Sequence, residues 1–377
     1  MIDQANTKAP PHRLLSLDVF RGLTIAGMIL VNSPGNSTAY APLEHAEWNG
    51  WTPTDLVFPF FVFILGVSLV FSFRKRRESG QPDQQVVLQI LRRTAIIFGL
   101  GLLLNGFPYY HLSTIRIPGV LQRIALCYFF AALLYLMCAT RTLAILAASL
   151  LIGYWLLLTH VPVPGSGIGD LTKAGNLAAY IDRWILAGHT YTPDYDPEGI
   201  LSTLPAIASA LIGVLTGIWL SSGESKIEMR KCEWMAWVGA AGIVSGEVWN
   251  FWFPINKALW TSSYVLFTSG AALVLLALCY WLIEVKGRRG WSRFFEVFGV
   301  NAIAAYVLSI FVLKIQNRIP IANPDGTAGN LRLFITRHLF ESWTSPVKGS
   351  LLYAACHTAL WFMILSALYK RRIFIKV

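Results

Sequence analysis

One stretch of the chain reads LVFPFFVFILGVSLVFSF, from Leu56 to Phe73, and contains 18 residues without a charge. The basic run Arg74-Lys75-Arg76-Arg77 follows it directly. A helix of this length and composition crosses the hydrocarbon core of a bilayer, and Lys and Arg gather at the cytoplasmic ends of such helices. The stretch therefore predicts a membrane-spanning helix that ends in the cytoplasm.

The whole chain has the same apolar character. Of its 377 residues, 55% are hydrophobic and 14% are charged, whereas a soluble protein has roughly 45–50% and about 25%. This excludes a soluble enzyme, a disordered protein and a disulfide-stabilised scaffold. A β-barrel would show alternating segments of about 10 residues. We therefore predict an all-α polytopic membrane protein, with residues 1–377 forming a single domain of about ten transmembrane helices. The predicted ranges are 14–34, 56–73, 86–106, 117–138, 142–159, 200–220, 235–253, 262–283, 297–315 and 350–369.

The net charge of +11 is distributed in a way that orients these helices. Counted on alternate sides of the predicted bundle, 18 Lys and Arg residues lie on one side and 9 on the other. The positive-inside rule places the richer side, with both termini, in the cytoplasm. Short basic clusters between apolar runs predict contact with membrane lipid and no binding of nucleic acid. Three long loops, 35–55, 160–199 and 316–349, then lie on the opposite side.

Four arginines, Arg21, Arg92, Arg93 and Arg123, lie inside predicted helices, where a charge costs roughly 2.5–3.5 kcal/mol. Arg21 stands three residues after Asp18, so a local ion pair is its simplest interpretation. Arg93 lies about two turns into its helix and could extend to the cytoplasmic surface. Arg123 lies too deep for that, which predicts a buried partner.

The first long loop holds the most unusual of the histidines. His45 stands between Glu44 and Glu47 in a segment that is rich in aromatic and polar residues and has no Lys or Arg. A histidine in a solvated loop usually has no function, and the sequence contains no metal, nucleotide or nucleophile motif. From the residues alone, a transporter, a membrane enzyme and a structural membrane subunit all stay open, with transport the first choice.

Several longer stretches carry a resemblance that no short motif could carry. They are Leu15-Ser16-Leu17-Asp18-Val19-Phe20-Arg21-Gly22, Val31-Asn32, His45-Ala46-Glu47-Trp48-Asn49-Gly50-Trp51-Thr52-Pro53-Thr54-Asp55-Leu56-Val57-Phe58-Pro59, Ile117-Pro118-Gly119-Val120-Leu121-Gln122-Arg123, Asp196-Pro197-Glu198-Gly199-Ile200-Leu201, Asn256-Lys257-Ala258-Leu259-Trp260, Gly299-Val300-Asn301 and Arg371-Arg372-Ile373-Phe374. In this order they closely resemble the catalytic part of the heparan-α-glucosaminide N-acetyltransferase family, over essentially the whole chain. Without the long luminal amino-terminal domain of the lysosomal enzyme, the chain resembles a bacterial relative of the NagX type.

The resemblance implies a membrane enzyme that takes an acetyl group from cytoplasmic acetyl-CoA. It would transfer that group to the amino group of a glucosamine-type sugar on the other side of the membrane. Acetyl-CoA and an amino-sugar acceptor are then the expected partners, with no metal, and a bacterial inner membrane is the expected location. Whether the chain forms a homodimer is left open. His45 stands in the segment where the family has its catalytic histidine.

Amine chemistry supports the same residue. An amine attacks a thioester only when it is unprotonated, so a base must lie near the amino group, and imidazole titrates in the useful range. We predict His45 as the general base or as a transient acetyl carrier, and the sequence leaves both open. Asp55 would orient the imidazole or receive the proton, and Asn32 would hold the acyl carbonyl or the sugar. The other assignments are Glu47, Trp48 and Asn49 to the sugar, and Arg21, Arg93, Arg123 and Asn301 to the cofactor. An amino-sugar or lipid-linked sugar transporter stays as the alternative.

Overall fold

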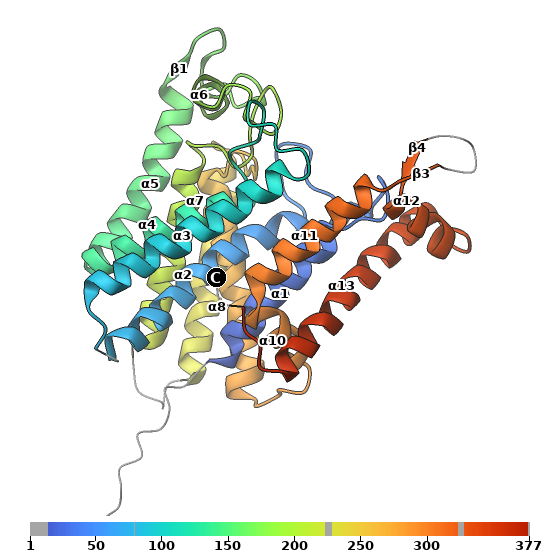
Figure 1. Ribbon diagram of the computed structural model, residues 1–377. Helices are drawn as coiled ribbons and strands as arrows, with labels where there is room; N and C mark the ends of the chain where they lie inside the picture. Colours follow the sequence, from blue (N-terminus) through green and yellow to red (C-terminus); the bar gives the residue numbers. More distant parts are fainter. Residues whose placement is uncertain (1–13, 79, 223–227, 323–327, 376–377) are drawn as a thin grey trace, which may run out of the picture.

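The computed structural model describes residues 14–78, 80–222, 228–322 and 328–375, and these residues are mostly helical (Figure 1). All ten predicted runs fall on helices, so the all-α architecture is confirmed. The helices that carry the runs are α1 (Leu15–Val31), α2 (Pro53–Glu78), α3 (Asp83–Gly106), α4 (Val120–Met137), α5 (Thr140–His160), α7 (Thr203–Ser221), α8 (Glu228–Asn250), α9 (Ser262–Tyr280), α10 (Ser292–Val300), α11 (Ala302–Arg318) and α13 (Pro346–Lys370).

Short elements occupy the connections. These are a 3-10 turn at Ala41–Leu43, α6 (Leu177–Ile185), α12 (Leu331–Thr336), and π-helical turns at Trp281–Val285 and Arg337–Glu341 that continue α9 and α12. Two small antiparallel hairpins pair β1 (Pro162–Val163) with β2 (Gly167–Ile168) and β3 (Pro320–Ala322) with β4 (Ala328–Asn330).

The helix lengths make the chain a multi-pass membrane protein. Seven helices among the described residues are long and apolar enough to cross a membrane, and α10 with α11 would make an eighth crossing. The predicted total of ten stays a prediction, because α1 has only 17 residues and α8 is not among the seven. The termini, residues 1–13 and 376–377, lie outside the described residues, and their cytoplasmic side also stays a prediction.

The prediction of one continuous helix over 297–315 is wrong. α10 and α11 meet at an angle of 83°, and Asn301 between them has φ −114° and ψ 36°, outside the helical region. Just before it, Gly299 packs so closely on α1 that an added Cβ would lie 2.1 Å from the carbonyl oxygen of Asp18. Asn301 is the only polar residue between Val297 and Ala305, and a single asparagine in an apolar run does not by itself predict a bend.

Helices α1 and α2 lie at the centre of the bundle. α2 packs along α7, and α1 packs along α10. Glycines permit both approaches: a Cβ on Gly22 would lie 1.7 Å from the carbonyl oxygen of Phe295, and one on Gly66 would lie 2.0 Å from that of Ala210. Backbones this close leave little room to shift, so these contacts fix the depth of every side chain that α1 and α2 carry.

The bundle has two distinct ends. At the basic end, in the lower part of Figure 1, α1 begins and α2 and α13 end. At the loop end, the long loops pack on one another: Trp48 Nε1 donates to the Leu171 carbonyl at 2.8 Å, and Asn36 Nδ2 donates to Glu341 at 2.7 Å. The three loops thus meet at one end, as the predicted topology requires.

Candidate active site

A cavity of about 410 Å³ lies at the loop end, where α1 ends and α2 begins. Its walls come from the first long loop, from the 191–198 segment and from the connection between α8 and α9. We call it the histidine cavity. Five of the residues predicted for the site line it. Its polar and aromatic lining residues include Asn32, His45, Glu47, Trp48, Asp55, Arg116, Tyr191, Tyr195, Glu198, Lys257 and Trp260.

His45 and Asp55 form the central contact of this cavity. His45 Nδ1 lies 2.6 Å from Asp55 Oδ1, and the side chains are 53% and 1% exposed, respectively. Lys257 Nζ lies 2.9 Å from His45 Nδ1 and 3.1 Å from Asp55 Oδ1. Burial lowers the pKa of Lys257, and the charge of Asp55 opposes this shift. A buried carboxylate therefore holds an imidazole at the cavity surface, with an ammonium group beside both.

The start of α2 fixes Asp55 in place. Its Oδ2 accepts hydrogen bonds from the backbone N–H groups of Ala46, at 3.0 Å, and Thr52, at 3.1 Å. Its backbone carbonyl accepts a hydrogen bond from the Tyr264 hydroxyl of α9 at 2.5 Å. A carboxylate in the first turn of a helix is also favoured by the helix dipole. These interactions hold the carboxylate in one orientation and leave Oδ1 for His45 and Lys257.

The tautomer of His45 follows from the same contacts. A carboxylate accepts hydrogen bonds but does not donate them, so Nδ1 carries the proton and donates to Asp55. Lys257 then donates to Asp55 and not to Nδ1. In the neutral ring, Nε2 then carries the lone pair. A carboxylate that orients an imidazole in this way is the arrangement used in general-base catalysis.

Arg116 organises another wall of the cavity. Its guanidinium donates to Asp196 at 2.9 and 2.6 Å and to Glu198 at 2.5 Å, and it lies 4.7 Å from the ring centre of Tyr191. Burial alone would lower the pKa of Arg116, but the two carboxylates raise it above its ordinary value. The guanidinium thus fixes Glu198 on the cavity wall with its charge partly neutralised.

The residues predicted to bind the sugar divide into two groups. Glu47 and Trp48 line the histidine cavity, and Trp48 meets Tyr195 edge to face with ring centres 5.2 Å apart. Asn49 instead accepts a hydrogen bond from Asn256 Nδ2 at 3.1 Å and so ties the first loop to the connection between α8 and α9. Aromatic rings and a few fixed polar groups are the usual lining of a small-molecule site.

Arg123 lies behind the histidine cavity and is 1% exposed. It donates to the Pro197 carbonyl at 2.9 Å and to Ser202 Oγ at 2.5 Å, and its guanidinium lies 5.0 Å from the ring centre of Trp260. Arg123 therefore has the buried partners predicted for it, and it holds the 197–202 segment in place. Its contact with a cofactor stays a prediction.

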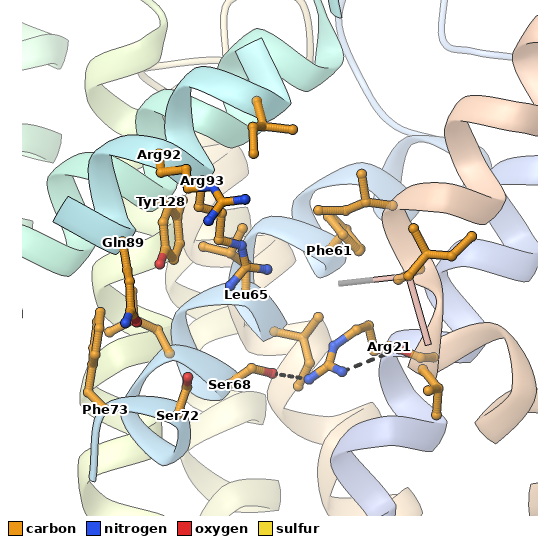
Figure 2. A pocket seen from close by; sticks show the side chains of 18 of the residues that line it. Arg21, Phe61, Leu65, Ser68, Ser72, Phe73, Gln89, Arg92, Arg93 and Tyr128 are labelled. Carbon is orange, nitrogen blue, oxygen red and sulfur yellow. Dashed lines mark hydrogen bonds between the residues drawn. The ribbon is translucent and has the colours of Figure 1, made fainter. Parts of the chain in front are cut away.

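A second cavity, of about 570 Å³, lies toward the basic end between α1, α2, α3, α4 and the bend at Asn301 (Figure 2). Four guanidinium groups line it, from Arg21, Arg76, Arg92 and Arg93. We call it the arginine cavity. These side chains come from three helices, so the cavity gathers positive charge that is spread widely along the sequence.

Arg21 makes the ion pair predicted for it and still lines this cavity. It donates to Asp18 Oδ1 at 3.2 Å, to Ser68 Oγ at 2.6 Å (Figure 2) and to the Gly299 carbonyl at 3.3 Å. The last contact joins α1 to the residue just before the bend. Arg21 is thus held in place by α2 and α10 as well as by its own helix.

Arg93 is placed differently. Its guanidinium lies 4.6 Å from the ring centre of Tyr128, and Figure 2 shows it reaching from α3 into the space above Ser68. Its Nε is buried and meets no hydrogen-bond acceptor among the described residues. The donors of Arg21, by contrast, meet Asp18, Ser68 and the Gly299 carbonyl.

Asn301 borders the arginine cavity without lining it. Its Oδ1 accepts a hydrogen bond from the Ile375 N–H at 2.8 Å, and its Nδ2 donates to the Ile373 carbonyl at 3.4 Å. Ile375 is itself part of the cavity wall. Asn301 therefore positions a segment of the wall, and its own contact with a cofactor stays a prediction.

The two cavities lie at successive depths along the same helices. α2 contributes Asp55 to the histidine cavity and Ser68 to the arginine cavity, and these residues are separated by about 20 Å of helix. α1 likewise contributes Asn32 and Arg21.

A family model described as heparan-alpha-glucosaminide N-acetyltransferase, catalytic, matches residues 13–254, which is more than half of the chain and includes His45, Asp55 and Arg93. The chain belongs to this family. The human heparan-alpha-glucosaminide N-acetyltransferase is 32% identical over 98% of this chain and 60% of its own length. The mouse protein of the same name is 31% identical over 98% of this chain and 61% of its own length. The chain thus spans about 60% of the length of these curated relatives.

Membership of the heparan-alpha-glucosaminide N-acetyltransferase family confirms the resemblance seen in the sequence motifs. The NagX-type subgroup, the bacterial inner membrane and a homodimer stay predictions. Sequence reasoning did not predict a role for Lys257. This lysine lies in Asn256-Lys257-Ala258-Leu259-Trp260, one of the stretches that resemble the family, and that position was the only sign of a role in the site. Arg116 and Tyr191 gave no comparable signal, because only the fold brings them near His45.

Proposed function

We propose that this chain is an acetyl-CoA-dependent N-acetyltransferase that transfers the acetyl group across a membrane to the amino group of a glucosamine-type sugar. The observation that carries the proposal is the His45–Asp55 pair on the wall of the histidine cavity, in a chain of this family. The arginine cavity at a second depth supplies a place for the donor.

The proposed transfer uses the free lone pair of His45 Nε2. The neutral amine of the sugar attacks the carbonyl carbon of the thioester, and Nε2 accepts the proton that the nitrogen loses. The C–S bond then breaks, and the imidazolium returns the proton to the sulfur of CoA, which leaves an amide and free CoA. Asp55 stabilises the imidazolium between these steps. If the acetyl group moves to Nε2 first, Asp55 orients the same lone pair as a nucleophile.

The acceptor would occupy the histidine cavity. Glu47 and Glu198 offer carboxylates to an amino group, and Trp48 offers an apolar ring face to a sugar. Asn32, at the end of α1, lines the same space and would donate its amide N–H to the carbonyl oxygen as negative charge develops there.

The donor would be anchored in the arginine cavity. Guanidinium groups keep their charge and grip phosphate oxygens with two donors each, and the buried Nε of Arg93 has no other acceptor among the described residues. From phosphates held near Arg21 and Arg93, the pantetheine arm would run along α1 and α2. The thioester would then reach His45 while the nucleotide stays at the basic end, which we infer to be cytoplasmic.

Vesicles that contain the purified protein test this proposal. Acetyl-CoA with a labelled acetyl group is added outside, and glucosamine is enclosed inside. We expect labelled N-acetylglucosamine in the lumen and free CoA outside. With both reactants outside and no sugar inside, we expect no product, because the two cavities serve opposite faces. Unchanged acetyl-CoA in every arrangement would reject the enzyme, and accumulation of unmodified sugar would favour the transporter.

A further inference from the structure

The connection between α8 and α9 places an ammonium group in direct contact with the reacting pair. Lys257 Nζ is 3.1 Å from Asp55 Oδ1 and 2.9 Å from His45 Nδ1. Its neighbours hold the connection rigidly: Asn256 Oδ1 accepts a hydrogen bond from the Leu259 N–H at 2.9 Å, and the Asn256 N–H donates to Thr261 Oγ1 at 3.0 Å. The position of Lys257 beside the pair is therefore fixed by buried backbone.

A carboxylate alone would hinder a base. A negative charge within hydrogen-bond distance of an imidazole favours the imidazolium, and an imidazolium has no lone pair on Nε2. Other carboxylates near His45 also favour the imidazolium: Glu44 and Glu47 flank it on its own loop, and Glu198 lines the same cavity.

The other cation of the cavity wall does not compensate for these charges. Arg116 is bonded to Asp196 and to Glu198, and these two carboxylates outnumber its single charge. Lys257 forms an ion pair with Asp55, beside the contact of His45 with the same carboxylate oxygen.

We propose that Lys257 is a positioning residue of the transfer reaction: by sharing Asp55 Oδ1 with His45, it cancels the charge of the carboxylate and keeps the imidazole neutral until the amine arrives. Asp55 then retains its orienting hydrogen bond without holding a proton on Nε2. The inference rests on the proposed function for its role in turnover, but the protonation state of His45 can be measured without turnover.

Three substitutions test this inference. Lys257→Met removes the charge and keeps the apolar length, Lys257→Arg keeps the charge, and Lys173→Met removes a charge at the loop end, where Lys173 Nζ lies 5.8 Å from the ring centre of Trp48. Lys257→Gln replaces Lys257→Met if that variant does not fold, as judged by thermal unfolding in detergent.

The first readout is the pH dependence of carbethoxylation of His45 by diethyl pyrocarbonate, which reacts with neutral imidazole. Mass spectrometry of the peptide that contains His45 reports the rate. We expect the midpoint of Lys257→Met to lie roughly 1 to 3 pH units higher than in the unsubstituted protein, because a neighbouring charge of the same sign as the imidazolium is lost. We expect Lys257→Arg and Lys173→Met to leave the midpoint unchanged.

The second readout is the acidic limb of the pH profile for acetyl transfer, which should move to higher pH by the same amount in Lys257→Met. An unchanged carbethoxylation midpoint in a folded Lys257→Met or Lys257→Gln protein would overturn the inference, whatever the activity. Absence of transfer by the unsubstituted protein would instead reject the proposed function, and the midpoint shift would still report on Lys257.

Discussion

The histidine cavity and the arginine cavity share two helices but are built in different ways. The reacting pair of the histidine cavity joins a loop residue to a helix start, and backbone N–H groups of the loop hold the carboxylate of Asp55. The arginine cavity is lined mainly by side chains of α1, α2 and α3. Arg93 there contacts the ring of Tyr128 and has a buried Nε without a hydrogen-bond partner among the described residues.

This difference fits the work that we propose for each cavity. Proton transfer needs atoms held within hydrogen-bond reach, and a network of backbone donors provides that precision. Capture of a highly charged donor needs the right sign of charge over a wide area, with long side chains free to adapt. The residues for chemistry and the residues for capture should therefore respond separately to substitution.

His45→Ala is expected to have the largest effect, which should fall on acetyl transfer and not on CoA binding. Loss of a general base typically slows a reaction 10²- to 10⁴-fold, and the exposed side chain contributes little packing. Acetyl transfer should fall by that factor while CoA affinity, measured by calorimetry, stays unchanged. His160→Ala removes an exposed histidine at the same end of the bundle and should leave transfer intact. Wild-type turnover in His45→Ala would refute the assignment.

Arg93→Gln is expected to have the opposite pattern, with weaker CoA binding and an unchanged His45. A hydrogen bond to a charged group contributes about 1.5–3 kcal/mol, so the Kd for CoA should rise roughly 10- to 100-fold. The carbethoxylation rate of His45 should not change. Arg141→Gln, at an exposed position in the first turn of α5, is the matched control and should bind CoA normally. Equal affinity in both variants would remove Arg93 from the donor site.

A smaller effect, on the stability of the fold, is expected from a substitution where α1 crosses α10. Gly22→Ala places a Cβ 1.7 Å from the Phe295 carbonyl oxygen, and overpacking of this kind costs about 1–3 kcal/mol. Gly99→Ala meets nothing within 4 Å and should be neutral or slightly stabilising, because alanine favours helix. Thermal unfolding in detergent compares the two. A Tm of Gly22→Ala equal to that of Gly99→Ala would show that the crossing tolerates displacement.

The two cavities also differ in how much of each could be predicted from the sequence. Apolar runs predicted helices, and charges inside those runs predicted Arg21 and Arg93 as unusual, because hydropathy and membrane cost are local properties. The contact between Lys257 and Asp55 joins residues 202 positions apart, and no pattern of spacing encodes it. The bend at Asn301 escaped prediction for a related reason: it accompanies the close approach of Gly299 to α1, and a single asparagine in an apolar run does not by itself predict a bend.

That bend also has an electrostatic consequence. Because α10 ends at Val300, α11 begins a new helix whose first residues, Ala302 and Ile303, form part of the wall of the arginine cavity. The side chain of Asn301 does not cap this helix and is bonded to the 373–375 segment instead. The first amide N–H groups of a helix have no partner within it, and together they act as roughly half a positive charge. A straight helix would have carried those groups to the membrane surface, whereas the bend brings them to the depth of the four arginines, where backbone as well as side chains attracts an anion.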